Sequence, residues 1–360
     1  MYLYLFYLLR NQQRDKAMKT SIIIPTAGRP IAIKSAIQSL IKIKPEHYAA
    51  EIIIVDNNTS SELSDDLKAY CMTLENRVCY VREQSPGLSA ARHRGAAEAK
   101  SECLTFIDDD VEVSETWLPT IQDAFANPEV AMVGGPSIPK FTCSIPSWFW
   151  DYVTPTPYGG WMCSWLSLLD IGKDVPNINP NFIWGLNFSI RKQVMESCGG
   201  FHTDLVPSEF QRWQGDGETG LTMKVQAAGY RTDYLQDAIL LHLCGPDRLN
   251  VGYFQKRGYF QGVCDSYTQI RRGQEPVFEL PQQARKTLSR RLLREAAKVW
   301  RRLKGQTTPS SLWANEAANV KVLTHQAYRD GWLFHQREVF ADPALLAWVR
   351  RENYFDTNIR

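Results

Sequence analysis

Three consecutive aspartates, Asp108, Asp109 and Asp110, follow directly on the apolar segment CLTFI at residues 103–107. Carboxylates this close together repel one another and cost stability on burial unless a cation or hydrogen-bond donors compensate their charge. A hard divalent cation, held by one or two carboxylates together with substrate phosphates, provides that compensation. Aspartate is also common in surface turns, so an exposed turn is the alternative. The position after a buried strand favours a metal and phosphate site.

Two further loops follow apolar segments in the same way. Asp56 comes directly after EIIIV at residues 51–55, and the loop at residues 25–29 comes after SIII at residues 21–24. The Asp56 carboxylate has the chemistry to accept hydrogen bonds from a nucleobase or ribose, although a lone aspartate here more often caps a helix or turn. Parallel sheets bind ligands beyond the carboxyl ends of their strands, so we expect these loops to form one site.

Segments of strand and helix length alternate regularly from Thr20 to Gly135. The apolar segments are rich in Ile and Val and are apolar on both faces, as in buried parallel strands. Repeated strand–helix–strand units predict an α/β fold with a parallel sheet covered by helices on both sides. The predicted strands are residues 21–24, 51–55, 78–81, 103–107 and 130–134, and the predicted helices are residues 30–43, 61–74, 88–100 and 114–125, the second and fourth opened by Ser61 and Ser114 as N-caps.

The pattern changes between Ser137 and Pro180, which contains six prolines and four tryptophans. This composition is too aromatic for a plain linker and predicts a large ordered loop over a binding cleft. Regular segments then return: a strand at 182–190, a short helix to residue 198, a helix at 217–228 ended by glycine, an apolar strand at 238–243, and a mostly helical remainder.

The chain also carries two segments that bear on membrane contact. The first nine residues are apolar, but a spanning helix needs about 20 residues, and the basic residues follow this segment instead of preceding it as in a secretory signal. An upstream start or an interfacial anchor remain as interpretations. Residues 285–304 hold nine basic side chains and one acidic one at helical spacing, which predicts a helix that packs on the domain or docks on an anionic membrane.

Composition excludes several classes of protein. The net charge of +2 argues against a surface built for nucleic acid. Eight cysteines without a CxxC pair exclude zinc ribbons and dense disulfide frameworks, and indicate reduced thiols in a cytosolic enzyme. The first strand is followed by no GxGxxG, which disfavours a nicotinamide dehydrogenase, and the chain contains no GxxxxGK[ST] of a P-loop nucleotidase.

Several segments together resemble family-2 glycosyltransferases of GT-A fold. SIIIPTAGRP, EIIIVDNNTS, SPGLSAARHRGAAEAK and LTFIDDDVEVSETWL resemble, in that order, the family's nucleotide-binding half. WGLNFSIRKQVMESCGGF resembles its acceptor-side segment, and GDGETGLTMKVQAAGYRT resembles its acidic helix start. The resemblance covers about residues 20–245. It implies a GT-A type mixed, mainly parallel sheet with an N-terminal extension at 1–17, a nucleotide-sugar half at 18–136, an acceptor half at 137–247 and a helical C-terminal extension at 248–360.

The resemblance also implies roles for individual residues on the donor side. Asp56 would hold the nucleobase, Asp108 would approach the ribose, and Asp110 would ligate Mg²⁺ or Mn²⁺ on the diphosphate. Arg92 and Arg94 would face the nucleotide, with a solvated helix face as the alternative, and His93 stands where the family carries Asn. The remaining residues expected to bind the nucleotide sugar are Pro25, Thr26, Ala27 and Asp109.

An inverting transferase needs a carboxylate to take the proton from the acceptor hydroxyl. Glu218 falls on the family's catalytic acid, and Asp216, two residues earlier, is the second candidate; helix capping is the alternative role for both. Gly220 replaces the family's second acid.

Other residues carry weaker expectations. His242 interrupts an apolar strand and is either a core residue or a metal ligand, as in several GT-A relatives. Trp184 and Asn187 are candidates for the acceptor site, with a core position as the alternative for Trp184. A basic and aromatic patch formed by Tyr253, Lys256, Arg257 and Tyr259 is a further candidate for the donor diphosphate.

The expected function is metal-dependent, inverting transfer of a hexose from a nucleoside-diphosphate sugar, with a UDP-sugar favoured, to a hydroxyl of a glycan or lipid-linked glycan. We expect a role in cell-surface polysaccharide biosynthesis, a cytoplasmic location with peripheral membrane association as an option, and no nucleic-acid partner. The alternative is a catalytically silent nucleotide-sugar-binding scaffold of a polysaccharide assembly complex. The intact acidic triplet and Glu218 argue against that alternative.

Overall fold

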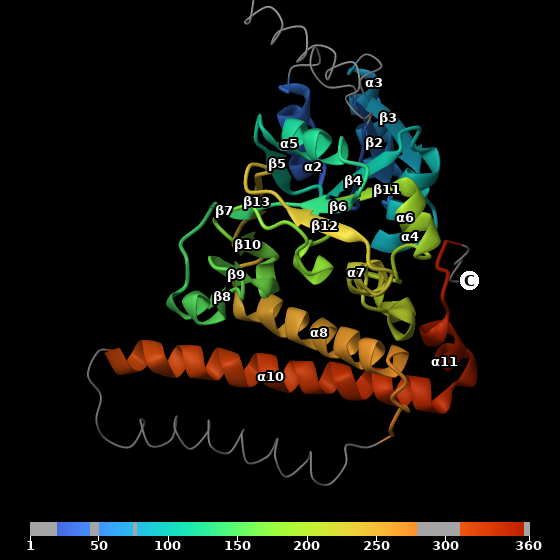
Figure 1. Cartoon of the computed structure of the whole chain (residues 1–360). Coiled ribbons are helices and arrows are strands. Elements are labelled where there is room, and N and C mark those ends of the chain that lie inside the picture. Colours follow the sequence, from blue (N-terminus) through green and yellow to red (C-terminus); the bar gives the residue numbers. More distant parts are fainter. Residues whose placement is uncertain (1–19, 44–49, 75–77, 279–309, 356–360) are drawn as a thin grey trace, which may run out of the picture.

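The computed structural model describes residues 20–43, 50–74, 78–278 and 310–355 (Figure 1). The N-terminal segment 1–17 and the basic segment 285–304 lie outside the described residues, so their predicted roles stay predictions. Within the described ranges, no helix combines the length and apolar character needed to cross a bilayer.

The larger of two sheets has seven strands in the order β12-β6-β11-β4-β1-β2-β3. Four neighbouring strands, β4, β1, β2 and β3, run parallel, whereas β11 pairs antiparallel with both β4 and β6. The mixed, mainly parallel sheet predicted from the sequence is confirmed. The strands are β1 (Thr20–Thr26), β2 (Ala50–Asp56), β3 (Val78–Arg82), β4 (Cys103–Ile107), β6 (Val130–Gly134), β11 (Asn187–Arg191) and β12 (Arg231–Tyr234).

Helices cover both faces of this sheet, as predicted. Ile22 and Ile24 of β1 face one apolar core and Ile23 faces the other, which explains why the strands are apolar without alternation. One core is covered by α2 (Pro30–Ile41), α3 (Ser61–Met72) and α5 (Trp117–Phe125), and the other by α4 (Leu88–Glu98), α6 (Lys192–Ser197) and α7 (Glu218–Ala227).

Two predicted helix starts differ in detail. The N-cap of α3 is Ser60, whose hydroxyl accepts a hydrogen bond from the backbone N–H of Leu63, and Ser61 is the first helical residue. Helix α5 begins at Trp117, three residues after Ser114. Of the predicted strand at 182–190, only the part from Asn187 onward is a strand.

The smaller sheet overturns the expectation of a large loop over a cleft. It contains six strands in the order β5-β13-β7-β10-β9-β8, and residues 137–170 supply four of them. Strands of two to five residues, two of them containing proline, show no readable period, which is why the sequence predicted a loop. The strands are β5 (Val111–Val113), β7 (Ser137–Phe141), β8 (Thr154–Pro155), β9 (Trp161–Cys163), β10 (Leu168–Asp170) and β13 (Leu240–Cys244).

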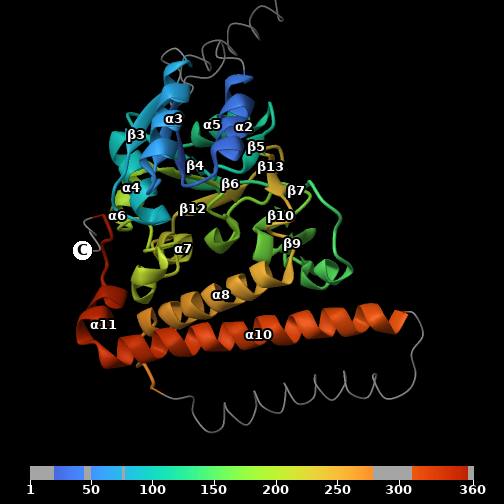
Figure 2. The same ribbon diagram turned by 180° about the vertical axis from the view of Figure 1, so that it is seen from behind.

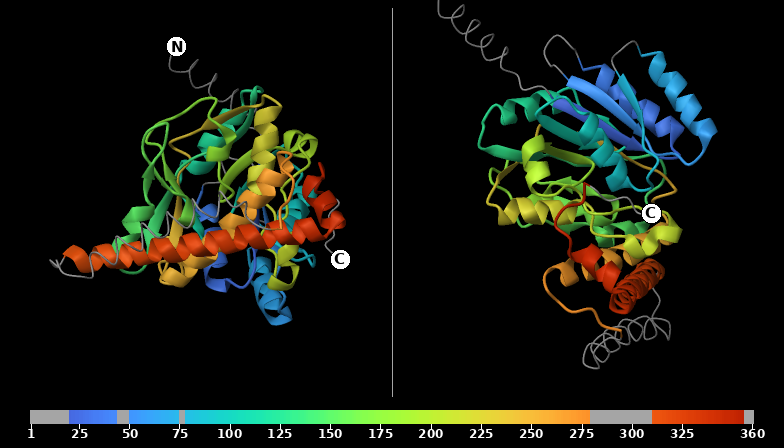
Figure 3. Two further views of the ribbon diagram at one scale, coloured as in Figure 1. Left: turned by 90° about the horizontal axis from the view of Figure 1, so that it is seen from below. Right: turned by 90° about the vertical axis from the view of Figure 1, so that its right-hand side faces the viewer.

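The aromatic side chains of this region form a core of their own with the C-terminal helices. Trp148 and Tyr152 pack edge to face on Phe254 of α8 (Val251–Arg271). Helix α10 (Ser310–Ala341) lies along α8, and α11 (Pro343–Arg350) follows it (Figures 1 and 2). Figure 3 shows α10 running across the underside of the domain. The predicted helical C-terminal extension is therefore packed against the rest of the chain.

Glycines allow α8 and α10 to approach each other closely. A Cβ atom at Gly262 of α8 would lie 1.9 Å from the carbonyl oxygen of Tyr328, and one at Gly331 of α10 would lie 2.0 Å from that of Tyr259. Backbone atoms cannot yield as a flexible side chain can, so any larger residue at these positions separates the helices.

This close approach makes a testable prediction. Gly262→Ala should lower the free energy of unfolding by about 1–3 kcal/mol because the added methyl group overpacks the interface. Gly252→Ala, on the same helix, meets only the side-chain oxygen of Asn250 at 3.3 Å and should be neutral or slightly stabilising. Chemical denaturation of both variants tests this, and equal stabilities would contradict the helix contact.

Candidate active site

Two cavities lie at the carboxyl ends of β1, β2, β3 and β4. The smaller, about 130 Å³, is lined by Pro25, Thr26 and Ala27 together with Asp108 and Asp109. The larger, about 570 Å³, is lined by residues that follow β1, β2 and β3, and Ala27, Asn57 and Leu205 border both cavities. The strand-end loops expected to form one site therefore lie together around these two cavities.

Asp56 lies beside the larger cavity but is itself fully buried. One carboxylate oxygen accepts hydrogen bonds from the backbone and side-chain N–H groups of Asn58 at 2.9 and 2.6 Å. The other accepts from the Tyr80 hydroxyl at 2.6 Å and from Arg82 at 2.8 Å. Burial alone would raise the pKa of Asp56, but these donors, led by Tyr80, hold it below its ordinary value. Asp56 thus orients Asn58 and Arg82, which line the cavity and which sequence analysis missed.

The acidic triplet lies where the chain passes from the larger sheet, at β4, to the smaller sheet, at β5. Asp109 accepts hydrogen bonds from Thr26 at 2.7 Å and from Arg29 at 2.8 Å. Arg29 also contacts Asp110 at 2.5 Å, and Arg248 donates to the same oxygen of Asp110. Burial raises the pKa of Asp109 to about 7, with Arg29 opposing the rise. Arginines from two distant loops therefore compensate the repulsion that the sequence predicted.

His242 and Asp110 face each other in the buried part of the site. The Nε2 atom of His242 lies 3.5 Å from Oδ1 of Asp110, and neither this oxygen nor either ring nitrogen makes a hydrogen bond within the described part of the chain. Burial opposes ionisation of Asp110, but His242, Arg248 and Arg29 hold its pKa well below the ordinary value.

These unsatisfied atoms fit a divalent cation. No group of three or more His, Cys, Asp or Glu side chains suited to a metal occurs among the described residues. Asp110 and His242 would therefore supply two ligands and leave the remaining positions to phosphate oxygens and water, a donor set that suits Mn²⁺ or Mg²⁺.

Arg92 of α4 is buried between the donor side and the candidate base. Its guanidinium lies 3.3 Å from Asp108, 3.6 Å from Glu218 and 3.0 Å from the carbonyl oxygen of Gly185, and it stacks over the Phe201 ring. Only 2% of the Arg92 side chain is exposed, so it organises the carboxylates instead of lining either cavity.

The two residues that follow Arg92 contact other protein groups and line neither cavity. His93 is buried, accepts a hydrogen bond from the backbone N–H of Phe201 at 2.9 Å, and has its pKa lowered to about 3 by burial. Arg94 lies on the exposed face of α4, where it pairs with Glu98 at 2.8 Å. Arg94 therefore lies on a solvated helix face, which was the alternative to contact with the nucleotide.

The two candidate bases point in different directions. Glu218, at the start of α7, is 29% exposed and accepts from the backbone N–H of Gly185 at 3.3 Å. Asp216 is buried, with one oxygen 2.7 Å from His202 and the other 2.7 Å from Thr268. Asp204, which sequence analysis missed, lies near Glu218; burial and the charge of Glu218 raise its pKa to about 6.

The expected acceptor residues differ in accessibility. Asn187 is buried, accepts from the indole N–H of Trp117 at 2.9 Å, and donates to the carbonyl oxygens of Pro136 and Ala238. Trp184 is partly exposed and donates to the carbonyl oxygen of Asn181 at 3.1 Å. Asn187, expected at the acceptor site, is therefore bound inside the protein, whereas Trp184, for which a core position was the alternative, keeps surface available for a sugar.

The basic and aromatic patch on α8 is not one surface. Tyr253 lies 3.4 Å from Arg248, next to the acidic triplet. Arg257 instead reaches the carbonyl oxygen of Ser164, and Tyr259 packs on Phe334 of α10. The basic residue of this region that lies next to the acidic triplet is instead Arg248, which the sequence did not single out.

Comparison with known proteins identifies the family. Residues 21–199 match the model described as glycosyl transferase family 2. Over these residues the chain belongs to that family. It resembles the glucosyl-dolichyl phosphate glucuronosyltransferase of Haloferax volcanii, with 22% identity over 251 residues that cover 68% of this chain and 75% of that enzyme. The chain is a glycosyltransferase that uses a nucleotide-sugar donor.

Two other comparisons extend this result. Polypeptide N-acetylgalactosaminyltransferase 3 of Mus musculus is 29% identical over 206 residues, which cover 51% of this chain and 32% of that enzyme. The match thus spans about a third of that animal relative. A structure of the mannosyltransferase PcManGT from Pyrobaculum calidifontis in complex with GDP-Man and Mn²⁺ superposes with a TM-score of 0.50 and 16% identity, covering 96% of this chain and 92% of that one. This likeness confirms the GT-A fold.

The buried guanidinium of Arg92 leads to a testable prediction about stability. Arg92→Met should lower the free energy of unfolding by roughly 2–3 kcal/mol, because Asp108 and Glu218 lose their shared cation and the Gly185 carbonyl loses a donor. Arg94→Met, two residues further along the same helix, should change it by less than about 0.5 kcal/mol. Urea denaturation measures both, and an Arg92→Met variant as stable as Arg94→Met would contradict the described site.

Proposed function

We propose that the enzyme transfers a hexose from a nucleoside-diphosphate sugar to an acceptor hydroxyl, with inversion and with the help of a divalent cation. The observation that carries this proposal is the arrangement at one sheet edge: two cavities that share lining residues, the acidic triplet beside them, and Glu218 on the other side of Arg92.

The donor would lie along this edge from nucleoside to sugar. The nucleoside would occupy the larger cavity, beside Arg82 and Asn58, and the diphosphate would lie near Asp110 and His242. Arg29 and Arg248, already at the triplet, would donate to phosphate oxygens, for which a guanidinium is well suited. The cation, when bound, stabilises the negative charge that develops on the leaving diphosphate.

Glu218 would act as the general base. Its carboxylate is partly exposed, whereas Asp216 has both oxygens bound inside the protein. The N–H of Gly185 and the guanidinium of Arg92 hold Glu218 in place, so that one oxygen can take the proton of the acceptor hydroxyl as it attacks the anomeric carbon. A single displacement on the face opposite the diphosphate inverts the anomeric configuration.

The resemblance and the relatives support a choice of donor and acceptor for the proposal. We propose a UDP-sugar as donor, on the strength of the family resemblance. We propose a glycan or lipid-linked glycan as acceptor, because the relative from Haloferax volcanii is named for a dolichyl phosphate substrate. The solved neighbour holds GDP-Man, so guanosine donors belong in any test. A role in cell-surface polysaccharide biosynthesis at the cytoplasmic face of the membrane is part of the same proposal.

The base assignment makes a testable prediction. Glu218→Gln should lower turnover at least 100-fold, because the carboxamide cannot accept the hydroxyl proton. It should leave donor affinity within about twofold, since Glu218 lies outside both cavities. Calorimetry and release of nucleoside diphosphate measure the two effects, with the exposed Glu196→Gln as control. Wild-type turnover in Glu218→Gln contradicts the assignment, and a wild-type protein that binds donor without turnover supports the silent scaffold.

The metal assignment makes a second prediction. Asp110→Asn should weaken Mn²⁺ binding at least tenfold, because it removes the charged ligand that faces His242. Electron paramagnetic resonance of Mn²⁺ titrations, with and without UDP or GDP, measures this directly. Asp170→Asn, in the smaller sheet away from both cavities, is the control. Unchanged Mn²⁺ affinity in Asp110→Asn would contradict the site.

A further inference from the structure

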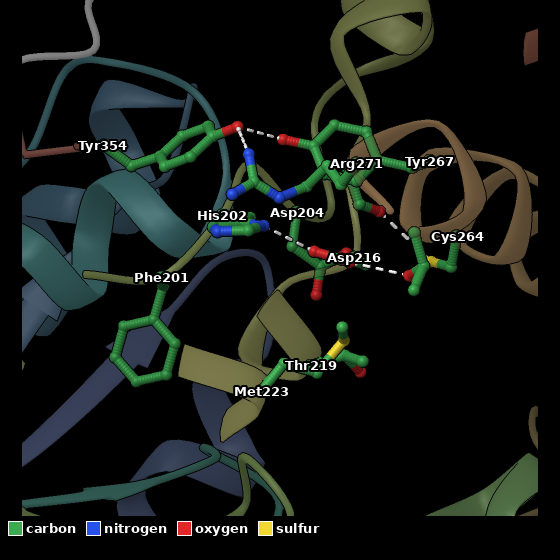
Figure 4. A network of polar contacts seen from close by, with 12 residues as sticks. Phe201, His202, Asp204, Asp216, Thr219, Met223, Cys264, Tyr267, Arg271 and Tyr354 are labelled. Atoms are coloured by element: carbon green, nitrogen blue, oxygen red, sulfur yellow. Dashed lines mark hydrogen bonds and ion pairs between the residues drawn. The ribbon is translucent and has the colours of Figure 1, made fainter. Parts of the chain in front are cut away.

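A buried polar network lies next to the start of α7 (Figure 4), and neither His202 nor Asp216 lines either cavity. At its centre, Asp216 accepts from the Thr268 hydroxyl of α8 at 2.7 Å and pairs with Nδ1 of His202 at 2.7 Å. Asp216 is 5% exposed and His202 is fully buried. Burial lowers the pKa of His202, so the neutral ring donates its Nδ1 proton to the carboxylate. Each oxygen of the Asp216 carboxylate is therefore hydrogen-bonded inside the protein.

The backbone on either side of Asp216 is fixed as well. The N–H of Gly215 donates to the carbonyl oxygen of Thr203 at 2.8 Å, and the N–H of His202 donates to that of Gly217 at 3.0 Å. Gly217 has a φ of +56°, a backbone conformation that glycine adopts readily, and the chain turns there into α7. The N–H of Thr219 donates across this turn to the carbonyl oxygen of Asp216 at 3.0 Å. Glu218 follows at once, so its position depends on this segment.

The C-terminal extension supplies several side chains of this network. Tyr267 of α8 and Tyr354, after α11, share a hydroxyl hydrogen bond, and the His202 ring packs on Tyr354 at 4.2 Å between centroids (Figure 4). Arg271 of α8 donates to the carbonyl oxygens of Val349 and Arg351. Helix α8 and the chain after α11 thus pack together next to His202 and Asp216.

The same packing explains a departure from the family pattern. A Cβ atom at Gly220 would lie 1.9 Å from the His202 ring, so the position that carries the family's second acid has no room for a side chain here. The buried carboxylate of this region is Asp216 instead, and it faces α8.

We infer that Asp216 and Thr268 are positioning residues, through which the C-terminal extension sets the orientation of Glu218. The Thr268–Asp216 hydrogen bond ties α8 to the Asp216 side chain, and it fixes the residue two positions before the base. Asp216 does not itself take the acceptor proton, since both of its oxygens are bound and buried. This inference rests on the proposed role of Glu218.

Substitution of Thr268 tests the inference. Thr268→Val keeps the side-chain shape and removes the hydroxyl; we expect turnover to fall about tenfold or more, with donor and Mn²⁺ affinities unchanged, since small displacements of a catalytic group are costly. Thr268→Ser keeps the hydroxyl and should restore wild-type turnover. Ser266→Ala removes a buried hydroxyl of the same helix that bonds His335 of α10, and should leave turnover unchanged.

A second measurement is independent of the donor. Hydrogen exchange of a peptide spanning residues 214–222 should be faster in Thr268→Val than in wild type, and unchanged in Ser266→Ala. Equal exchange and equal turnover in these two variants would overturn the inference even if Glu218→Gln confirms the base. Asp216→Asn should retain more turnover than Glu218→Gln; complete loss in Asp216→Asn, with normal turnover in Thr268→Val, would make Asp216 the base and overturn the inference as well.

Discussion

Compensation of negative charge at the carboxyl edge of the larger sheet is the constraint on which the rest of the site depends. Asp108, Asp109 and Asp110 follow β4 without a break, and Glu218 lies on the other side of Arg92. Carboxylates brought this close are stable only with cations beside them. Arg29, Arg92 and Arg248 supply that charge from three separate loops and helices. Binding of a donor diphosphate and a metal would redistribute these contacts, not create a charged site anew.

The two-sheet architecture brings these groups together. The triplet spans the passage from β4 in the larger sheet to β5 in the smaller one, and His242 arrives on β13, which pairs with β5. Arg248 follows in the loop between β13 and α8, so the same loop that closes the site leads into the C-terminal extension. The aromatic core between the smaller sheet and α8 anchors that loop. The extension is therefore joined to the site at two places, through Arg248 and through Thr268.

The strand-end loops of the candidate site were predictable from the sequence because the strands are apolar on both faces and end in polar loops. The strands ending near Thr26, Asp56 and Ile107 were predicted to within a few residues, and the family assigned from the same segments is confirmed. The side chains that contact these residues could not be predicted from the sequence. Tyr80 lies 24 residues from Asp56, and Arg248 lies 138 residues from Asp110, so only the folded chain brings them together.

The aromatic region at residues 137–180 shows what local sequence patterns could not predict. Its strands are too short to display a period, and their order depends on pairing with β13, which comes some 100 residues after β7 in the chain. Gly220 is a similar case: the sequence showed that the family's acid was missing, but only the position of the His202 ring explains why. Local patterns therefore predicted the elements, whereas contacts between distant segments decided which carboxylates are free.

The most direct test of the account is calorimetry of the wild-type protein with UDP-, GDP- and dTDP-sugars, each with and without Mn²⁺. We predict that one nucleotide class binds with an affinity at least tenfold higher in the presence of Mn²⁺, because Asp110 and His242 would hold the cation that compensates the charge of the diphosphate. Binding that is equally strong without Mn²⁺, or no binding of any donor under either condition, would contradict a metal-dependent donor site at this edge of the sheet.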